Sequence, residues 1–392
     1  MPAFFLILGF VFFLFHMYSF KKLKDALGLG NYSYIFFCFL AILFSSVPAL
    51  VNLYQENGDF HLARFFFYGY IWLGFIFILT STLLLCDFLN FFTRKISRFF
   101  PREGSFKKFS PQKKPTSRSL NSSDSKKTWF FIALAVSFVI SIHGFFEAKD
   151  VRVEKIVIHS NKIPKRIKIV QISDLHIGLN TKEDFLRKIV NKINAVDPDL
   201  LISTGDLVDV FFDGINVFAG QLRAINPRLG KYAVTGNHEF YAGIDDSINF
   251  TKMAGFRVLR EEGVTINNII SLVGMDDNAA GQGIKKEKAR INALMKMLPE
   301  NTYKILLRHR PAVADNTKEI FDLQLSGHTH GGQIFPFTIV TWFFYPVRTG
   351  LKKLSSSNFI YVSKGTGTWG PPMRFLARPE ITLIELVPVK KQ

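Results

Sequence analysis

Polar residues of the metal-ligand type follow five short apolar runs in the second half of the chain. Imidazole and carboxylate groups are ligands that Zn, Fe and Mn accept, so this set predicts a metal site. It has too many members for one ion, and a carboxylate can bridge two ions. Any one of these residues alone would be read as a capping Asp or a hydrogen-bonded core His, but that alternative explains the whole set poorly. The set is Asp174, His176, Asp206, Asn237, His238, His309, His328 and His330.

The apolar runs that precede these residues predict β-strands, because they are short and rich in Val, Ile and Leu. Between the first two runs, residues 183–195 carry apolar side chains at helical spacing, which predicts a helix. Ligand sites in α/β sheets gather beyond the carboxyl ends of the strands. We therefore expect the five strand ends to converge on one cleft. The runs are 167–172, 199–203, 231–235, 303–307 and 323–325.

Five sequence blocks carry these strand-end residues: SDLH, GD, GNHE, a His shortly before Pro311, and GHTH. In order and approximate spacing they resemble the calcineurin-like metallophosphoesterases. The likeness covers residues 165–387, and two segments, GHTHGGQIFP and GTGTWGPPMRFLARPEITLIEL, are similar to the bacterial membrane-associated branch of that family. The resemblance implies an α/β fold in which two mixed β-sheets form a sandwich flanked by helices. It assigns this metallophosphoesterase domain to residues 150–392.

The resemblance also implies cofactors and residue roles. Two divalent metal ions, Mn, Fe or Zn, are implied for each chain, with Asp206 bridging them. His238 is implied to be a non-ligand that contacts the scissile phosphate and protonates or stabilises the leaving alkoxide. The implied activity is hydrolysis of a phosphodiester or other phosphoester by a metal-activated hydroxide. The remaining ligands divide into Asp174, His176 and His330 for the first ion, and Asn237, His309 and His328 for the second.

Charged residues around these blocks have two interpretations. Arg308 and Arg310 flank His309, and they are predicted to bind a second phosphate or an acidic headgroup of the substrate. The alternative is that both face solvent or pair with nearby carboxylates. Asp209 is expected beside the site or on the surface rather than as a metal ligand. Asp277 is expected in a capped turn or a loop of the cleft.

The first 149 residues predict a membrane anchor. They contain 29 of the 43 Phe residues and four apolar runs, within which Asp87 is the one residue with a full charge. About 20 helical residues cross a hydrocarbon core, which the two middle runs exceed and the outer two approach. A cleaved signal peptide is the alternative for the first run, but no basic segment precedes it. His16, in that run, is expected as a neutral imidazole bonded to a neighbouring helix. The predicted spans are 4–20, 32–54, 65–89 and 129–146.

Loop charges predict the orientation of these spans. The 21–31 loop carries three Lys and one Asp, and the 91–128 loop carries eleven Lys and Arg against two acidic residues. Both loops are expected in the cytoplasm, the second as a basic linker that is solvated or lies on anionic lipid. The 55–64 loop, with two acidic residues and one Arg, is expected outside. The chain is therefore predicted as a multi-pass protein of the cell membrane with its catalytic domain on the extracytoplasmic side.

Composition excludes several function classes and suggests partners. Two Cys are too few for a disulfide scaffold or a Cys-based zinc site. The net charge of +18 divides evenly between residues 1–149 and 150–392, so no nucleic-acid partner is expected. The uncharged run 334–347 contains the consecutive aromatic residues Trp342, Phe343, Phe344 and Tyr345, which favours contact with a phospholipid bilayer over a buried strand. A phosphate-ester substrate, with a lipid-linked one among the candidates, is the expected ligand.

Two further functions stay open at this point. One is a nucleotide-lipid pyrophosphatase similar to the UDP-2,3-diacylglucosamine hydrolases, whose cytoplasmic substrate conflicts with the predicted orientation. The other is an inactive metal-binding scaffold or receptor. Degenerate members of the family lose ligands, whereas every expected position is filled in this sequence. The sequence predicts no oligomeric state.

Overall fold

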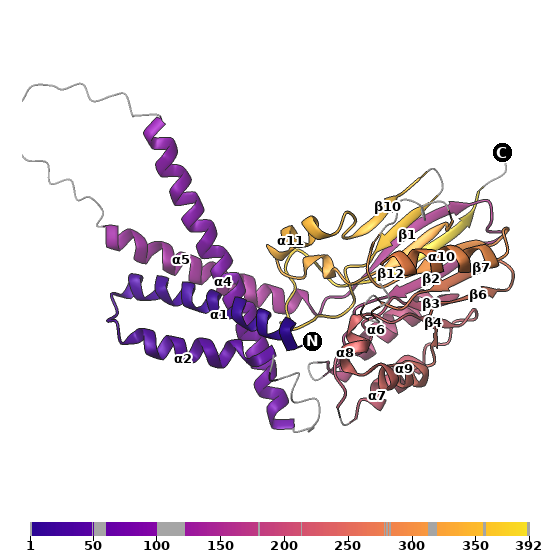
Figure 1. The fold of residues 1–392 in the computed structure, drawn as a ribbon, viewed down its shortest axis with the longest axis horizontal. Coiled ribbons are helices and arrows are strands. Elements are labelled where there is room, and N and C mark those ends of the chain that lie inside the picture. The colour runs from indigo at the N-terminus through magenta and orange to yellow at the C-terminus, as the bar shows by residue number, and fades with distance from the viewer. Residues whose placement is uncertain are drawn as a thin grey trace, which may run out of the picture. The chain divides into compact units, whose positions relative to one another are not determined.

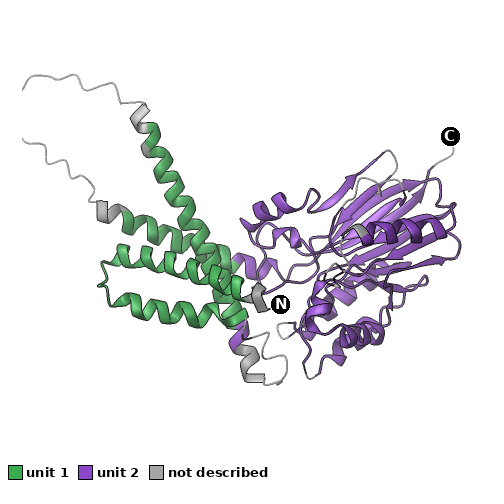
Figure 2. Cartoon of the chain, viewed as in Figure 1, with its two compact units in different colours: residues 1–52, 68–142 green, residues 53–67, 143–392 purple. Residues whose placement is uncertain are grey.

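The computed structural model describes residues 2–48, 50, 60–99, 122–178, 181–212, 214–277, 279, 281, 284–312, 320–355 and 358–389 (Figure 1). The chain divides into two compact units, which Figure 2 colours separately. Unit 1 comprises residues 1–52 and 68–142, and unit 2 comprises residues 53–67 and 143–392.

Unit 1 is built from apolar helices, and two of them continue into unit 2. Three contain a stretch long and apolar enough to cross a membrane: residues 6–27, 65–93 and 126–147. The predicted spans 4–20, 65–89 and 129–146 each lie within one of these helices. The helices are α1 (Pro2–Leu27), α2 (Ser33–Ser45), α4 (Phe60–Phe99) and α5 (Ser122–Glu147).

The fourth predicted span, 32–54, stays a prediction. Its described part contains α2, which has 13 residues and is too short to cross a bilayer by itself. Residues 49 and 51–54 lie outside the described residues, as does most of the predicted basic linker 91–128.

His16 of α1 is fully buried among the helices of unit 1. The indole N–H of Trp72 donates to Nε2 of His16 at 2.8 Å, and Nδ1 of His16 lies 2.7 Å from the carbonyl oxygen of Phe12. Because an indole can only donate, Nε2 accepts and Nδ1 carries the proton that Phe12 receives. The imidazole is therefore neutral and bonded to a neighbouring helix, as predicted from the sequence.

Unit 2 contains two six-stranded mixed sheets. The first has the order β1-β12-β2-β3-β4-β5, in which β2 to β5 are parallel. The second has the order β10-β11-β9-β8-β7-β6, in which β11, β9, β8 and β7 are parallel. The first-sheet strands are β1 (Arg152–Ser160), β12 (Glu380–Pro388), β2 (Ile167–Ile172), β3 (Leu200–Ser203), β4 (Lys231–Ala233) and β5 (Arg257–Val258). The second-sheet strands are β10 (Gly350–Lys353), β11 (Phe359–Val362), β9 (Leu323–Ser326), β8 (Tyr303–Leu307), β7 (Ile270–Gly274) and β6 (Glu262–Ile266).

Side chains alternate between the two faces of each sheet, and in central strands such as β3, β7 and β9 the residues on both faces are buried. Ile169 of β2 packs in a cluster with Ile305 of β8, so the two sheets face each other across an apolar layer. The next residue, Val170, points to the other face, where helices cover the sheet. The result is a sandwich of two mixed sheets flanked by helices, which confirms the predicted fold.

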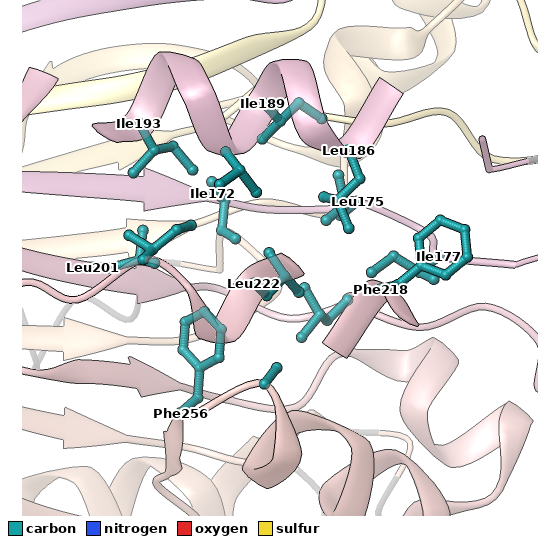
Figure 3. Close-up of a cluster of buried hydrophobic side chains, with 14 of the residues drawn as sticks. Ile172, Leu175, Ile177, Leu186, Ile189, Ile193, Leu201, Phe218, Leu222 and Phe256 are labelled. Atoms are coloured by element: carbon teal, nitrogen blue, oxygen red, sulfur yellow. The ribbon is translucent and has the colours of Figure 1, made fainter. Parts of the chain in front are cut away.

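The helix α6 (Glu183–Val196) shows how a helix is fixed to this sandwich. Leu186, Ile189 and Ile193 recur at helical spacing, and Figure 3 shows them pointing toward Ile172 of β2 and Leu201 of β3. Burying each such side chain contributes about 1.5–3 kcal/mol. The other helices of unit 2 are α7 (Asn216–Arg223), α8 (Asn237–Ala242), α9 (Ile244–Met253), α10 (Ile284–Met297) and α11 (Phe337–Phe344).

Candidate metal centre

The backbone turns sharply where the ligand-type residues follow the strands. Eleven described non-glycine residues have a positive φ, and five of them belong to the predicted ligand set. Left-handed backbone is sterically costly for most L-residues, and such costs concentrate at functional sites. The five residues are Asp174, His176, Asp206, His328 and His330.

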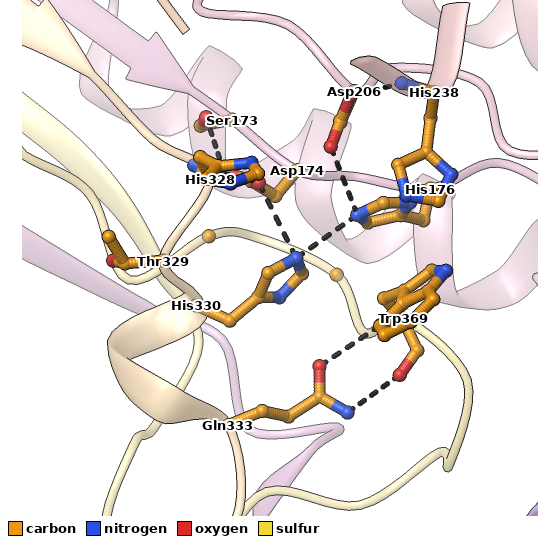
Figure 4. Close-up of polar contacts among 12 residues, drawn as sticks. Ser173, Asp174, His176, Asp206, His238, His328, Thr329, His330, Gln333 and Trp369 are labelled. Atoms are coloured by element: carbon orange, nitrogen blue, oxygen red, sulfur yellow. Dashed lines mark hydrogen bonds and ion pairs between the residues drawn. The ribbon is translucent and has the colours of Figure 1, made fainter. Parts of the chain in front are cut away.

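Asp174, His176 and His330 form the first group of ligand-type side chains. All three are buried, and one ligand atom of each lies within 4.8 Å of the others. Nε2 of His330 is 3.1 Å from Nε2 of His176 and 3.4 Å from Oδ1 of Asp174. Figure 4 shows these side chains pointing toward one another from separate loops. The structure thus brings together the three residues predicted for the first metal ion.

Asp206, His309 and His328 form the second group. Nε2 of His309 lies 3.1 Å from Oδ2 of Asp206 and 3.1 Å from Nδ1 of His328. The same Oδ2 of Asp206 is 3.8 Å from Nε2 of His176, which belongs to the first group. Asp206 therefore lies between the two groups, in the position that a bridging carboxylate needs.

Asn237, the first residue of α8, supplies an independent test of whether a cation fits. Its side-chain oxygen Oδ1 is buried and has no hydrogen-bond partner among the described residues. Buried polar atoms are nearly always satisfied, so an oxygen of this kind is available for an ion. Together with the carboxylates and imidazoles, it forms a donor set that fits divalent metals of the Mn, Fe and Zn type.

His238 lies beside these groups and is hydrogen-bonded to a carboxylate that the sequence did not assign to the metal site. Nδ1 of His238 is 2.6 Å from Oδ1 of Asp209. Burial alone would lower the pKa of His238, but Asp206 and Asp209 raise it to about 9. The two carboxylates therefore favour the protonated form of His238. His238 also groups with His176 and Asp206 by distance, and the bond to Asp209 fits the non-ligand role that the resemblance implies.

Glu239 holds the loop of Asp206 in place, a role that the sequence did not reveal. Its carboxylate accepts the backbone N–H groups of Asp206 at 3.0 Å and Leu207 at 2.6 Å, and that of Gly236 at 2.6 Å. The last bond is the half of a capping box in which the Glu three residues into the helix accepts the N–H of the N-cap residue at the start of α8. The available signal was the Glu of the GNHE block, three residues after Gly236, which is the spacing at which a Glu accepts the N–H of an N-cap residue.

Arg374 is a second functional residue that the sequence analysis missed. It is fully buried, and its guanidinium donates to the carbonyl oxygens of His330 at 3.1 Å, Lys364 at 2.6 Å and Ala377 at 3.0 Å. It also donates to Nδ1 of His330 at 3.2 Å. Burial, then the charges of His176 and Arg374, hold the pKa of His330 well below its usual value. His330 is thereby kept neutral, which is the form that binds a metal.

The structure corrects the predicted role of Arg308. This residue is buried, and its guanidinium bonds both carboxylate oxygens of Glu287, at 2.6 and 2.8 Å, and the carbonyl oxygen of Ala312. A guanidinium committed to a buried carboxylate is not available to a substrate, so Arg308 is a structural residue. This is the alternative in which the arginine pairs with a nearby acid.

Arg310 lies at the rim of the metal centre. Its Nε donates to Asp277 at 2.8 Å, and its guanidinium also hydrogen-bonds the phenol groups of Tyr241 and Tyr345. The ring of Tyr241 packs on His238 at 5.2 Å between centroids, and that of Tyr345 packs on His328 at 5.7 Å. Arg310 also pairs with a buried carboxylate, but its side chain is 29% exposed, whereas that of Arg308 is 8% exposed, so Arg310 remains a substrate-binding prediction.

Comparison with known proteins agrees with this site. A family model described as calcineurin-like phosphoesterase matches residues 167–332, which contain all eight strand-end residues. An uncharacterized metallophosphoesterase of Aquifex aeolicus is 38% identical over 258 residues, which cover 64% of this chain and 97% of the relative. One of Helicobacter pylori is 32% identical over 385 residues, which cover 96% of each chain.

A third relative bears on the anchor. The transmembrane protein with metallophosphoesterase domain of Danio rerio is 33% identical over 275 residues, which cover 65% of this chain and 62% of the relative. With the three membrane-length helices, this likeness indicates a membrane protein. The clustered His and Asp side chains and the close relatives lead to one assignment: the chain belongs to the calcineurin-like metallophosphoesterases, whose members are metal-dependent phosphoester hydrolases.

Proposed function

We propose that this protein is a membrane-anchored phosphohydrolase that uses two divalent ions to cleave a phosphodiester or phosphoester bond. The observation that carries the proposal is the pair of His and Asp groups that meet at Asp206, next to His238 with its bond to Asp209. Asp174, His176 and His330 would hold one ion, and Asn237, His309 and His328 the other. When bound, such ions neutralise the charge of phosphoryl oxygens and make water acidic enough to act as a nucleophile near neutral pH.

The chain's own residues supply the proton for the leaving group. His238 is oriented by Asp209, whose carboxylate favours the protonated imidazole, so it can donate to the departing alkoxide. Gly236 helps to place it, because a side chain at position 236 would collide with the carboxylate of Asp206. The backbone N–H of His238 donates to Oδ1 of Asp206 at 2.9 Å. The acid and the bridging carboxylate are therefore fixed relative to each other.

The substrate that we propose is lipid-linked and carries an acidic headgroup. Arg310 supports this choice, because its cationic group lies at the rim next to the tyrosines that pack on His238 and His328. The loop charges support an extracytoplasmic catalytic domain, which argues against a pyrophosphatase for a cytoplasmic nucleotide lipid. A periplasmic reporter fused near the C-terminus should be active, and an inactive one would reject this orientation.

The test of the activity uses full-length protein in detergent, purified without chelator. Metal content and the rate on an aryl phosphodiester are measured for the natural protein and for Asp206→Asn. Asp184→Asn is the matched control, because Asp184 is exposed and pairs with Arg187 on α6. About two Mn, Fe or Zn ions per chain, with a rate lost only in Asp206→Asn, would support the hydrolase. Absence of metal and rate, even after addition of Mn, would favour the inactive scaffold.

A further inference from the structure

The helix α11 exposes an apolar surface that is unusual for this domain. Trp342, Phe343 and Phe344 are 61, 73 and 74% exposed, and Phe337 is 48% exposed. Among the described residues from 148 onward, every exposed Phe or Trp lies between 335 and 344. Isolated apolar side chains on a surface are ordinary, but a contiguous aromatic group marks a site of contact with a membrane, another protein or a ligand. We call α11 together with Leu376, which is 69% exposed, the aromatic surface.

The aromatic surface borders the metal centre directly. Tyr345 caps α11, and its ring packs on the metal-type ligand His328. On the loop that leads to Leu376, the ring of Trp369 packs on His238 at 5.7 Å between centroids. The amide group of Gln333 donates to the carbonyl of Trp369 at 2.8 Å and accepts its N–H at 3.0 Å (Figure 4). The aromatic surface and the metal centre thus share one rim.

The same rim is joined to the end of a membrane-length helix. The last turn of α5, from His143 onward, belongs to unit 2. The carbonyl of Gly144 accepts the backbone N–H of Arg374 at 2.9 Å, and the ring of His143 packs on Phe375 at 6.1 Å. A Cβ at position 144 would lie 2.9 Å from the carbonyl oxygen of Arg374, so this close approach requires glycine. The loop before Leu376 therefore lies where α5 leaves its apolar stretch.

Lys residues follow both the end of α5 and the aromatic surface in the chain. Lys149 lies two residues after the end of α5, and its ammonium group lies 3.7 Å from the centroid of the Phe145 ring. Lys352 and Lys353 of β10 are exposed a few residues after α11. Aromatic side chains with neighbouring Lys are the arrangement that the interface of a bilayer favours, with rings among the upper acyl chains and ammonium groups at phosphates.

We propose that the aromatic surface inserts into the bilayer that the chain's own helices cross, and that it places the metal centre at the level of the lipid headgroups. The bilayer is the occupant because α5 ends on the loop that carries Leu376. A substrate with an acyl or isoprenoid tail would then reach His238 and His328 without leaving the membrane. This last consequence rests on the proposed function, whereas the insertion itself does not.

The experiment places a nitroxide label on the full-length protein, at one chain per nanodisc of phosphatidylcholine and phosphatidylglycerol. Cys38→Ala and Cys86→Ala remove the natural thiols, and Phe343→Cys carries the label. Met297→Cys, 80% exposed at the end of α10, is the aqueous control, and Phe138→Cys in α5 is the membrane reference. Relaxation by oxygen and by a water-soluble nickel complex reports the surroundings of each label.

Insertion predicts that the label at 343 resembles the reference at 138, with strong relaxation by oxygen and at least about a tenfold smaller effect of nickel than at 297. Strong relaxation by nickel at 343 would overturn the proposal. Weak relaxation by both agents would also overturn it, because the label at 343 would then be covered by protein rather than by lipid.

A second measurement separates this proposal from the proposed function. Trp342→Ser and Phe343→Ser, made together, should reduce the rate on a phosphodiester lipid in the disc by about tenfold or more and leave the rate on a soluble aryl diester unchanged. Equal loss on both substrates would reject access from the membrane plane. If the natural protein cleaves neither substrate, the proposed function fails, and the label at 343 still decides the insertion.

Discussion

The proton on His238 depends on Asp209, and Asp209→Asn should therefore shift the pH dependence of catalysis. The pKa of His238 is about 9, compared with an ordinary value of 6.5. Asp206 and Asp209 both contribute to this rise, but the charge of Asp206 would be shared with metal ions in the loaded protein. Asp209, whose Oδ1 lies 2.6 Å from Nδ1 of His238, would then be the main carboxylate that keeps the proton in place.

The size of the effect follows from this contact. An opposite charge at such a distance shifts a pKa by about 1–3 units. A shift of about 2 units, which corresponds to ~2.7 kcal/mol, would lower the pKa of His238 to about 7. Because the acid must be protonated, kcat/KM falls as the pH rises through this pKa. At about pH 8 the variant should be roughly tenfold slower than the natural protein, and near pH 6 the two should converge.

The assay records kcat/KM from about pH 5 to about pH 10 for the metal-loaded protein, Asp209→Asn and the control Asp184→Asn. Two aryl phosphodiesters are compared, one with a nitrophenyl and one with an unsubstituted phenyl leaving group. The poorer leaving group needs the proton of His238 more, so the loss at high pH should be larger for phenyl. Asp184→Asn should leave both profiles unchanged, because Asp184 is exposed and lies in the first turn of α6.

An unchanged basic limb in Asp209→Asn would refute this reasoning. A uniform loss at every pH, equal for both leaving groups, would mean that Asp209 positions the loop after β3 rather than the proton. The same loss together with a lower metal content would mean that Asp209 positions His176 for the metal, since Nδ1 of His176 is 3.7 Å from Oδ1 of Asp209.

Three further changes test other parts of the structure. Burial lowers the pKa of His309, but Asp206 raises it to about 10. A metal ion that binds His309 must therefore displace a proton. The affinity for Mn, measured by calorimetry, should rise about tenfold per pH unit from about pH 6 to about pH 8. Glu287→Gln leaves a buried arginine unpaired and should lower the free energy of unfolding by about 3–5 kcal/mol, measured in denaturant at constant metal. Gly144→Ala should weaken metal binding by about tenfold through displacement of Arg374, whereas Gly220→Ala in α7, where a Cβ meets no atom, should only stabilise its helix by about 0.5–1 kcal/mol.

The strands, and the gathering of the ligand-type residues at their ends, were predictable because their signals are local. A short apolar run followed by Asp or His specifies both the strand and the residue at its end, and β2 was predicted with its observed bounds, 167–172. The helix predicted at 183–195 ends one residue later, because Asp197 caps it and Pro198 cannot continue it. Parallel pairing then brings the strand ends to the same edge of a sheet, whatever the lengths of the loops.

The residues that the sequence did not reveal act through partners distant in the chain. Arg374 contacts His330 across 44 positions, and no periodicity relates the two residues. Glu287 neutralises Arg308 from a helix 21 positions earlier, so the arginine beside His309 was assigned to the substrate. In each case a buried charge needs a specific partner, and the tertiary structure alone identifies that partner.

Arg374 connects the end of α5 to His330 of the candidate metal centre. Its backbone N–H bonds the last turn of α5, while its side chain bonds both the carbonyl oxygen and Nδ1 of His330. A flexible tether would keep the enzyme near its membrane without these bonds, and it would not need glycine at position 144. Because a buried guanidinium has few alternative acceptors, a displacement of the end of α5 would either move the backbone of His330 or break these bonds. The last turn of α5 therefore helps to hold His330 in position through Arg374. Substitutions in this turn should be tested for their effect on metal affinity as well as on membrane attachment.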